Sequence, residues 1–204
     1  TQPVGYAIAR PPGTAGSLPV VVCLPGRGGT GNGSIIESLR FHDVASQLRA
    51  TGSIPALAIA AIDGGESYWH QRTSGEDRAR MLLREFLPLL ANVGLGTDGR
   101  PVALAGWSMG GYGALLAASR NPTAFRAVAV ASPALWTSPG DTAEGAFDSA
   151  EDYRAHDVFA SAATLRLPLR VDCGTGDPFI DATRAFVARL PSPPAGEFTP
   201  GCHD

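Results

Sequence analysis

Residues 106–110, Gly-Trp-Ser-Met-Gly, constrain the fold of this chain more than any other stretch. They follow the apolar run 101–105 and precede residues 111–120, which are rich in small residues and good helix formers. The sequence therefore predicts a strand, a sharp turn and a helix, with Ser108 at the apex. Glycines two residues before and after Ser108 let the strand and the helix approach where side chains would clash. Such a turn is typical of a nucleophile elbow, which pushes the serine hydroxyl outward. The alternative is a Gly-rich turn with a solvated serine.

The composition excludes several classes of protein. The 204 residues are 44% hydrophobic and 17% charged, as expected for one globular domain over residues 1–204. The net charge is −3 and the basic residues are scattered, so we expect no nucleic-acid partner and no anionic-membrane surface. Every basic residue is an arginine, which excludes Schiff-base and phosphate-loop lysines. No apolar run reaches the roughly 20 residues of a membrane span. Three cysteines fit neither a disulfide scaffold nor a zinc site.

Strands and helices alternate along the sequence, which indicates an α/β fold with a mostly parallel central sheet and helices on both faces. The continuous apolar runs 18–24 and 55–62 are typical of strands buried on both sides. Residues 137–164 are polar, and we expect them to form an excursion above the sheet and not a separate large lid domain. The expected strands span residues 4–10, 18–24, 55–62, 101–105, 127–131, 165–171 and 197–199, and the expected helices span residues 35–50, 76–90, 111–120 and 180–190.

A glycine-rich loop after the strand 18–24 has two interpretations. Gly26, Gly28 and Gly31 match the Gly-x-Gly-x-x-Gly pattern of a dinucleotide-binding fold, with Asp63 placed to hold a ribose. Against this, Pro25 stiffens the exit from the strand, and further glycines make the match less specific. Asp63 also follows later than the usual spacing of about 20 residues. A dinucleotide-dependent oxidoreductase stays open as the alternative.

The same loop can instead supply part of an oxyanion hole. Acyl-transfer enzymes aim two backbone N–H groups at the developing oxyanion. One comes from the residue after the nucleophile, here Met109, and the other from a loop after an early strand, here residues 25–28. Glycines in this loop allow the backbone to point an N–H group into the site.

A serine hydroxyl needs a base, and histidine is the usual base near neutral pH. In a fold with this kind of elbow, the acid and then the histidine follow the serine along the chain. Only His156 and His203 of the four histidines follow Ser108. His156 falls in the polar excursion, whereas His203 follows the last expected strand and a Pro-Gly turn. The sequence favours His203 as the base, and the alternative is that it belongs to a frayed chain end.

The acid must lie between the serine and the histidine, in a loop where a strand ends. Asp177 fits best because it follows the expected strand 165–171 and a Gly-Thr-Gly turn. Asp172 ranks second, since its position close to the strand allows it to point into the sheet. Asp181 falls in the first turn of a helix, where a carboxylate is stabilising for ordinary reasons. The alternative for Asp177 is an Asx turn.

With these residues identified, the chain resembles the esterase D and mycolyltransferase (antigen 85-like) branch of the α/β-hydrolase superfamily. That branch also contains feruloyl and acetyl xylan esterases. The resemblance rests on residues 106–115, on Cys-Gly-Thr-Gly-Asp-Pro-Phe at 173–179 and on Pro-Gly-Cys-His-Asp at 200–204. It covers the chain from the glycine-rich loop to the end.

The resemblance implies an α/β-hydrolase fold in which Ser108 is the nucleophile, Asp177 the orienting acid and His203 the base. The backbone amides of Arg27 and Met109 would form the oxyanion hole. The implied activity is that of a serine carboxylic-ester hydrolase with an acyl-enzyme intermediate, a small-molecule ester substrate, and no metal or organic cofactor. Two alternatives of the same fold are a mycolyltransferase-like acyltransferase and a non-catalytic binding protein. Export or association with the cell envelope is expected from the family and from a start without methionine.

Two further sets of residues are expected near Ser108. Cys173 and Cys202 are close in sequence to the acid and the base, so we hypothesise a disulfide between them, the alternative being two buried thiols. Four aromatic residues, Tyr68, Trp69, Trp107 and Trp136, fall on strand-end loops and are expected to line an acyl or aromatic pocket, although simple packing explains them equally well. His70 is expected to join them as a substrate-binding residue, and the alternative is a surface histidine.

Overall fold

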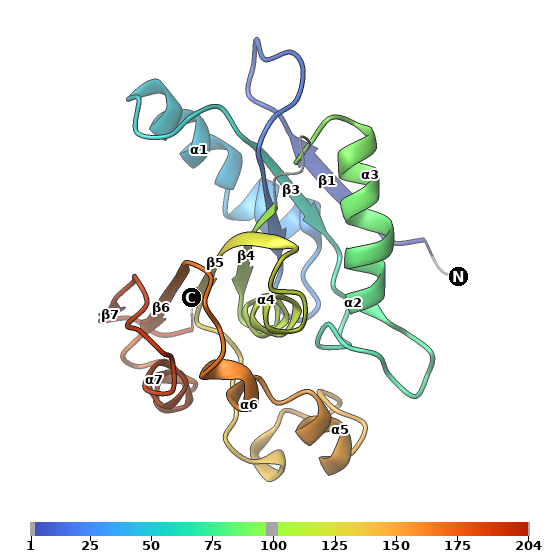
Figure 1. The fold of residues 1–204 in the computed structure, drawn as a ribbon, viewed down its shortest axis with the longest axis vertical. Coiled ribbons are helices and arrows are strands. Elements are labelled where there is room, and N and C mark those ends of the chain that lie inside the picture. Colours follow the sequence, from blue (N-terminus) through green and yellow to red (C-terminus); the bar gives the residue numbers. More distant parts are fainter. Residues whose placement is uncertain (1–2, 97–101, 204) are drawn as a thin grey trace.

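The computed structural model describes residues 3–96 and 102–203. A seven-stranded sheet in the order β1-β3-β2-β4-β5-β6-β7 runs through the centre of the molecule (Figure 1). The edge strand β1 is antiparallel to β3, and every other pair is parallel. The strands are β1 (Tyr6–Ala9), β2 (Val20–Leu24), β3 (Ala58–Ile62), β4 (Val102–Trp107), β5 (Phe125–Ala131), β6 (Leu169–Gly174) and β7 (Phe198–Thr199).

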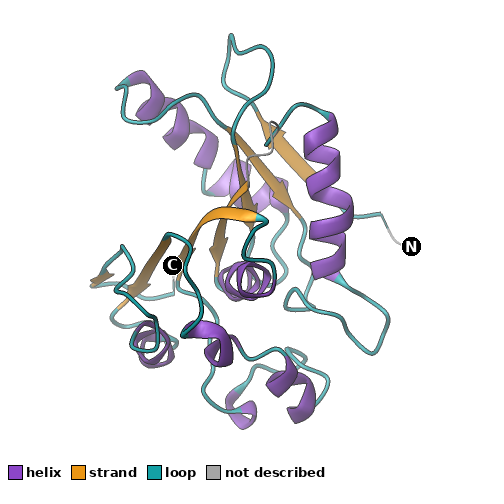
Figure 2. Cartoon of the chain, in the orientation of Figure 1, coloured by secondary structure: helices purple, strands orange, loops and turns teal. Residues whose placement is uncertain are grey.

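Helices lie on both faces of the sheet (Figure 2). The central helix α4 packs on β4 and β5, and it forms the main core together with the helices that follow β3 and β5. A smaller apolar cluster on the other face joins β2 and β3 to the first two helices. The helical segments are η1 (Gly31–Ser38), α1 (Phe41–Ala50), α2 (Arg78–Met81), η2 (Leu82–Phe86), α3 (Leu87–Asn92), α4 (Met109–Arg120), η3 (Pro139–Asp141), α5 (Ala150–Ala155), α6 (Val158–Ala162) and α7 (Ile180–Val187).

This architecture confirms the predicted α/β-hydrolase fold class, with two local differences. The helix expected over residues 35–50 is divided into η1 and α1, because Arg40 between them adopts a left-handed φ of 49°. The strand expected over residues 165–171 begins later and extends to Gly174, so Asp172 lies inside β6.

The polar segment 137–164 is more firmly attached than its composition suggests. Its last helix, α6, packs against α4, and Val158 and Phe159 are buried in the main core. Within the described ranges, no helix combines the length and the apolar character that crossing a membrane requires.

Candidate active site

The strand, turn and helix predicted around Ser108 are present. β4 leads directly into Ser108, which adopts φ 56° and ψ −120°, and α4 follows at once. A positive φ is costly for a residue with a side chain, so the surrounding structure must hold it in place. Glycines make the tight approach possible: a Cβ on Gly106 would overlap the carbonyl of Gly110, and a Cβ on Gly110 would overlap the carbonyl of Leu24.

The side chains of Ser108, His203 and Asp177 form one hydrogen-bonded row. Nε2 of His203 lies 2.8 Å from Oγ of Ser108, and Nδ1 of His203 lies 2.8 Å from Oδ2 of Asp177. The three residues follow β4, β7 and β6, and the carboxyl ends of these parallel strands meet at one edge of the sheet. A hydroxyl, an imidazole and a carboxylate in this order can transfer a proton from the hydroxyl to the ring.

The carboxylate of Asp177 is buried and surrounded by donors. Its Oδ1 accepts the N–H of Phe179 at 2.7 Å, its Oδ2 faces His203, and the hydroxyl of Ser132 also bonds to it. Burial acts to raise the pKa of Asp177, but these hydrogen bonds outweigh it and the pKa lies below its ordinary value. The carboxylate of Asp177 is therefore ionised at neutral pH. Ser132 has no motif around it, and the sequence analysis missed it for that reason.

Two backbone amides near Ser108 have no hydrogen-bond acceptor within the described part of the chain. Met109 occupies the first position of α4, where N–H groups have no partner within the helix. In the glycine-rich loop, residues 26–29 form a hydrogen-bonded turn, and the φ of 69° at Gly28 is that of a type II turn. The amide of Gly28 donates to the carbonyl of Gly65. Among the hydrogen bonds of the described residues, none uses the amide of Arg27 or Met109.

Aromatic rings surround the imidazole of His203. The ring of Trp107 stacks on it with centroids 5.5 Å apart, and the ring of Phe179 meets it at 5.2 Å. Trp136 packs edge to face on Phe179 at 5.5 Å. Trp107 and Trp136 are both half-buried, so part of each ring is open to a bound molecule.

The expectation that Trp69 and His70 contact substrate is wrong, because both side chains are enclosed in the core. Trp69 is 2% exposed and His70 is 0% exposed. The ring of Trp69 fills the space that Gly113 leaves on α4, where a Cβ would overlap it. Tyr68 is also buried and packs beneath Trp136, with ring centroids 5.4 Å apart. Tyr68 can therefore support the aromatic wall of the site, whereas the enclosed side chains of Trp69 and His70 cannot contact an ester substrate.

The other candidates for acid and base lie outside the hydrogen-bonded row. Asp172 is held by Arg170, which donates to both of its carboxylate oxygens at 2.6 and 2.8 Å. Asp181 is exposed in the first turn of α7. His156, at the end of α5, contacts Asp152. No disulfide joins the two cysteines near the acid and the base, both of which lie in the described part of the chain.

The glycine-rich loop is fixed by the aspartate that a dinucleotide-binding fold would use for a ribose. Oδ1 of Asp63 accepts the N–H of Gly31 at 2.6 Å, so this carboxylate closes the loop onto the end of β3. The structure thereby gives Asp63 a local role and weakens the dinucleotide interpretation.

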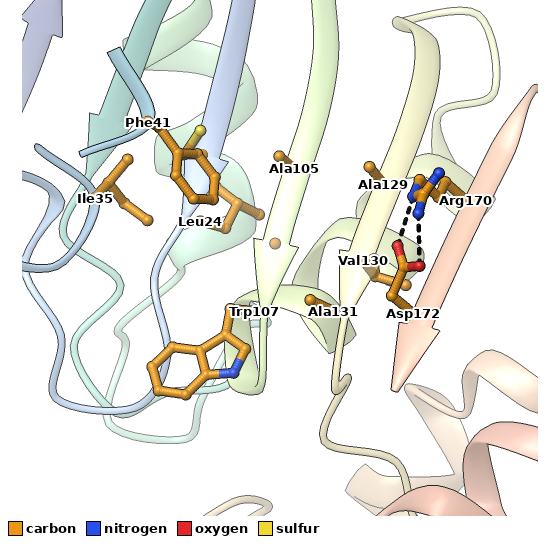
Figure 3. A pocket seen from close by; sticks show the side chains of 12 residues that line it. Leu24, Ile35, Phe41, Ala105, Trp107, Ala129, Val130, Ala131, Arg170 and Asp172 are labelled. Carbon is orange, nitrogen blue, oxygen red and sulfur yellow. Dashed lines mark hydrogen bonds and ion pairs between the residues drawn. The ribbon is translucent and has the colours of Figure 1, made fainter. Parts of the chain in front are cut away.

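An apolar hollow of about 170 Å³ lies on the face of the sheet where Ile35 and Phe41 pack (Figure 3). It runs over alanines of β4 and β5 and ends at Trp107. Ser108, Asp177 and His203 do not line it. The hollow and the hydrogen-bonded row are therefore neighbours that share only the strand end bearing Trp107.

Comparisons with known proteins agree with this fold. The family model described as Putative esterase matches residues 2–190, a range that contains Ser108 and Asp177. A comparison with curated proteins finds no match. Among solved structures, a ferulic acid esterase has a TM-score of 0.79 and 21% identity to this chain. The match covers 98% of this chain and 84% of the ferulic acid esterase chain.

Two further solved structures have lower identity and the same fold. An S-formylglutathione hydrolase from Agrobacterium tumefaciens has a TM-score of 0.79 and 18% identity, covering 98% of this chain and 83% of its own. A CE1 ferulic acid esterase from Anaeromyces mucronatus, solved in complex with ferulic acid, has a TM-score of 0.71 and 19% identity, covering 98% of this chain and 78% of its own. The family match favours an ester hydrolase over the oxidoreductase and over a binding protein. The chain belongs to the Putative esterase family and is a serine esterase of α/β-hydrolase fold, that is, a carboxylic ester hydrolase.

Proposed function

We propose that this esterase works through a triad of Ser108, His203 and Asp177 and through an acyl-enzyme intermediate. The observation that carries the proposal is the pair of 2.8 Å contacts made by one imidazole, to a hydroxyl on one side and to a carboxylate on the other. Because the ionised carboxylate holds the proton of the neutral ring on Nδ1, Nε2 presents its lone pair to the serine. The ring is thus in the tautomer that a general base requires.

The reaction then proceeds in two halves. Nε2 of His203 takes the proton of Ser108 while Oγ attacks the ester carbonyl, and the charge that develops on the carbonyl oxygen is met by the amides of Arg27 and Met109. The tetrahedral intermediate collapses, the bond to the alcohol oxygen breaks, and His203 gives its proton to the leaving alcohol. A water molecule, deprotonated by the same ring, attacks the acyl-enzyme and releases the acid and the free serine.

The substrate is proposed to be a small-molecule ester whose acyl group lies against aromatic rings. Trp107 and Trp136 are half-buried beside the row of catalytic side chains, and Tyr68 supports Trp136 from the core. The acyl-enzyme could equally pass its acyl group to an alcohol, as in a mycolyltransferase, and product analysis with and without an added sugar alcohol separates the two. Export stays a prediction.

The test combines turnover with active-site labelling. Wild-type enzyme should hydrolyse p-nitrophenyl acetate and react with a fluorophosphonate probe, and the modified peptide should carry the probe on Ser108. Ser108→Ala should lose at least about 10⁴-fold in kcat and all labelling, because the nucleophile is removed. Ser46→Ala is the matched control, since Ser46 lies on α1 and its hydroxyl donates to the carbonyl of His42 on the same helix. Labelling of another residue, or turnover that survives in Ser108→Ala, would contradict the proposal.

A further inference from the structure

Three potential metal ligands meet outside the catalytic triad. His70 comes from the loop after β3. Asp152 lies in the first turn of α5 and His156 is the residue that caps its C-terminal end, so the two are four residues apart on one face of that helix. Nε2 of His70 lies 3.0 Å from Oδ2 of Asp152, and Nδ1 of His156 lies 2.9 Å from Oδ1 of the same carboxylate. The candidate ligand atoms of these three residues, here the His–Asp–His cluster, lie within 4.8 Å of one another.

The hydrogen bonds around His70 do not balance for a neutral ring. Its Nδ1 lies 3.1 Å from the carbonyl oxygen of Tyr68, and its Nε2 faces the carboxylate of Asp152. A carbonyl and an ionised carboxylate only accept, whereas a neutral imidazole carries a single N–H. One ring nitrogen therefore directs a lone pair at an acceptor, unless a positive charge lies there.

A proton on both nitrogens of His70 would place that charge in a fully enclosed position. The ring is 0% exposed, it stacks on Phe147 at 5.1 Å, and the ring of His156 lies 4.3 Å away. An imidazolium buried among rings loses its hydration, which is costly. A cation between Nε2 and the carboxylate satisfies the same atoms with His70 neutral. The bond from Nδ1–H to a backbone carbonyl is the outer contact that metal-bound histidines usually make.

We propose that the His–Asp–His cluster binds one divalent transition-metal ion, for which Zn²⁺ is the best-suited candidate, through its two imidazoles and its carboxylate. Two imidazoles and one carboxylate form a known zinc ligand set that leaves a fourth position for water. Zinc holds such ligands at about 2.0–2.2 Å, which requires ligand atoms about 3–4 Å apart, so small side-chain rotations suffice. Asp152 and His156 are 14% and 13% exposed, which leaves an approach for the ion.

The ion would join two parts of the chain that are far apart in sequence. His70 follows β3, and Asp152 and His156 belong to the polar segment 137–164, so the ion acts as a clamp that holds this segment against the core. The inference does not rest on the proposed triad, because none of the three ligands belongs to it. Spacing gives no hint of the site in the sequence, since 82 residues separate His70 from Asp152.

The test measures Zn²⁺ binding and thermal stability together. Tag-free protein, stripped with a chelator, is titrated with Zn²⁺, and bound metal is counted after dialysis. The expected result is about one Zn²⁺ per chain, a rise in Tm with zinc, and a visible d–d absorption spectrum when Co²⁺ replaces zinc. His156→Asn should bind zinc at least about tenfold more weakly, because even loss of a ligand's outer hydrogen bond costs about 10- to 100-fold. Asparagine can still donate to the carbonyl of Asp152, which Nδ1 of His156 approaches at 2.9 Å, so the metal-free protein is expected to stay folded.

The matched control is His42→Asn, which removes a partly exposed histidine on α1 and should leave zinc binding unchanged. Asp152→Asn is the second variant if His156→Asn fails to fold, and it should also weaken zinc binding. Wild-type protein that retains no zinc and gains no stability from it would overturn the proposal, as would equal binding by wild type and the variants. The cluster would then be an imidazolium–carboxylate network.

Discussion

Replacing Asp177 by asparagine tests, through one atom, the proposed catalytic role of the hydrogen-bonded row of Ser108, His203 and Asp177. The substitution changes a carboxylate oxygen into an NH2 group and leaves the volume almost unchanged. Because Oδ1 of Asp177 accepts the N–H of Phe179 at 2.7 Å, the amide oxygen of asparagine must take that position. Its NH2 group then faces Nδ1 of His203, which lies 2.8 Å from Oδ2 in the wild type. A donor there moves the proton of the neutral ring to Nε2, where it points at Ser108 and the ring can no longer act as a base.

The expected loss in kcat is about 10⁴-fold, the size reported for the corresponding change of tautomer in serine-protease triads. At about 1.36 kcal/mol for each factor of ten, this is roughly 5.4 kcal/mol of transition-state stabilisation. KM should change little, because Asp177 is 2% exposed and cannot touch the substrate. The residual rate would come from the amides of Arg27 and Met109 and from substrate binding.

The assay is steady-state hydrolysis of p-nitrophenyl acetate together with the rate of fluorophosphonate labelling, and thermal melting checks that the variant is folded. Asp172→Asn is the control, because Asp172 lies in β6, five residues before Asp177, but pairs with Arg170 instead of a histidine. It should retain activity within a factor of about ten. Activity of Asp177→Asn within tenfold of the wild type, or an equal loss in Asp172→Asn, would refute the reasoning.

Three further predictions follow from contacts around the site. Ser132→Ala removes the hydroxyl bonded to Asp177. Because one hydrogen bond is lost, kcat should fall about two- to tenfold with KM unchanged, as measured by steady-state kinetics. Phe147→Ala removes a ring that contacts five others and should cost about 3 kcal/mol of the free energy of unfolding, measured with urea; a loss under about 1 kcal/mol would argue against this packing. Hydrogen bonds from Arg72 hold the pKa of Asp148 below its ordinary value. The ionised carboxylate therefore contributes its full stabilisation of the fold above the unfolded-state pKa of about 3.9, and this contribution is lost as the pH falls through the folded-state pKa. The Tm of Asp148→Asn should therefore lie below that of the wild type at neutral pH, and this difference should shrink in strong acid; a constant difference would contradict the assignment.

The position of the site could be predicted from the sequence because its residues follow strands of the parallel sheet. A parallel sheet brings the carboxyl ends of its strands to one edge, so residues that follow apolar runs are brought together wherever they lie in the chain. Ser108, Asp177 and His203 each follow such a run, and the structure places them within hydrogen-bonding distance. Their catalytic roles stay predictions until the variants are measured.

Burial of the loop aromatics could not be predicted in the same way. Trp69 and His70 carry the same loop context as Trp107 and Trp136, yet the first pair is enclosed and the second is half-exposed. The difference arises because Gly113 on α4 leaves space for the ring of Trp69. This fit joins two segments far apart in the sequence, so no local sequence pattern predicts it. The break between η1 and α1 at Arg40 is likewise invisible in the apolar periodicity of residues 35–50.

The strained residues of the site are tied to one another across strands, which explains how the fold sustains them. Ser108 and Ser132 both have positive φ, and each such backbone costs about 1–3 kcal/mol in isolation. The N–H of Ser108 donates to the carbonyl of Ala131, the N–H of Ser132 donates to the carbonyl of Asp172, and the N–H of Ala134 returns to the carbonyl of Ser108. These bonds continue the sheet sideways from β4 to β5 to β6 beyond the last paired residues. The strained turn at Ser108 and the strained turn that directs Ser132 at Asp177 therefore fix each other, so a change at one is expected to disturb both the Ser108 hydroxyl and the Asp177 carboxylate.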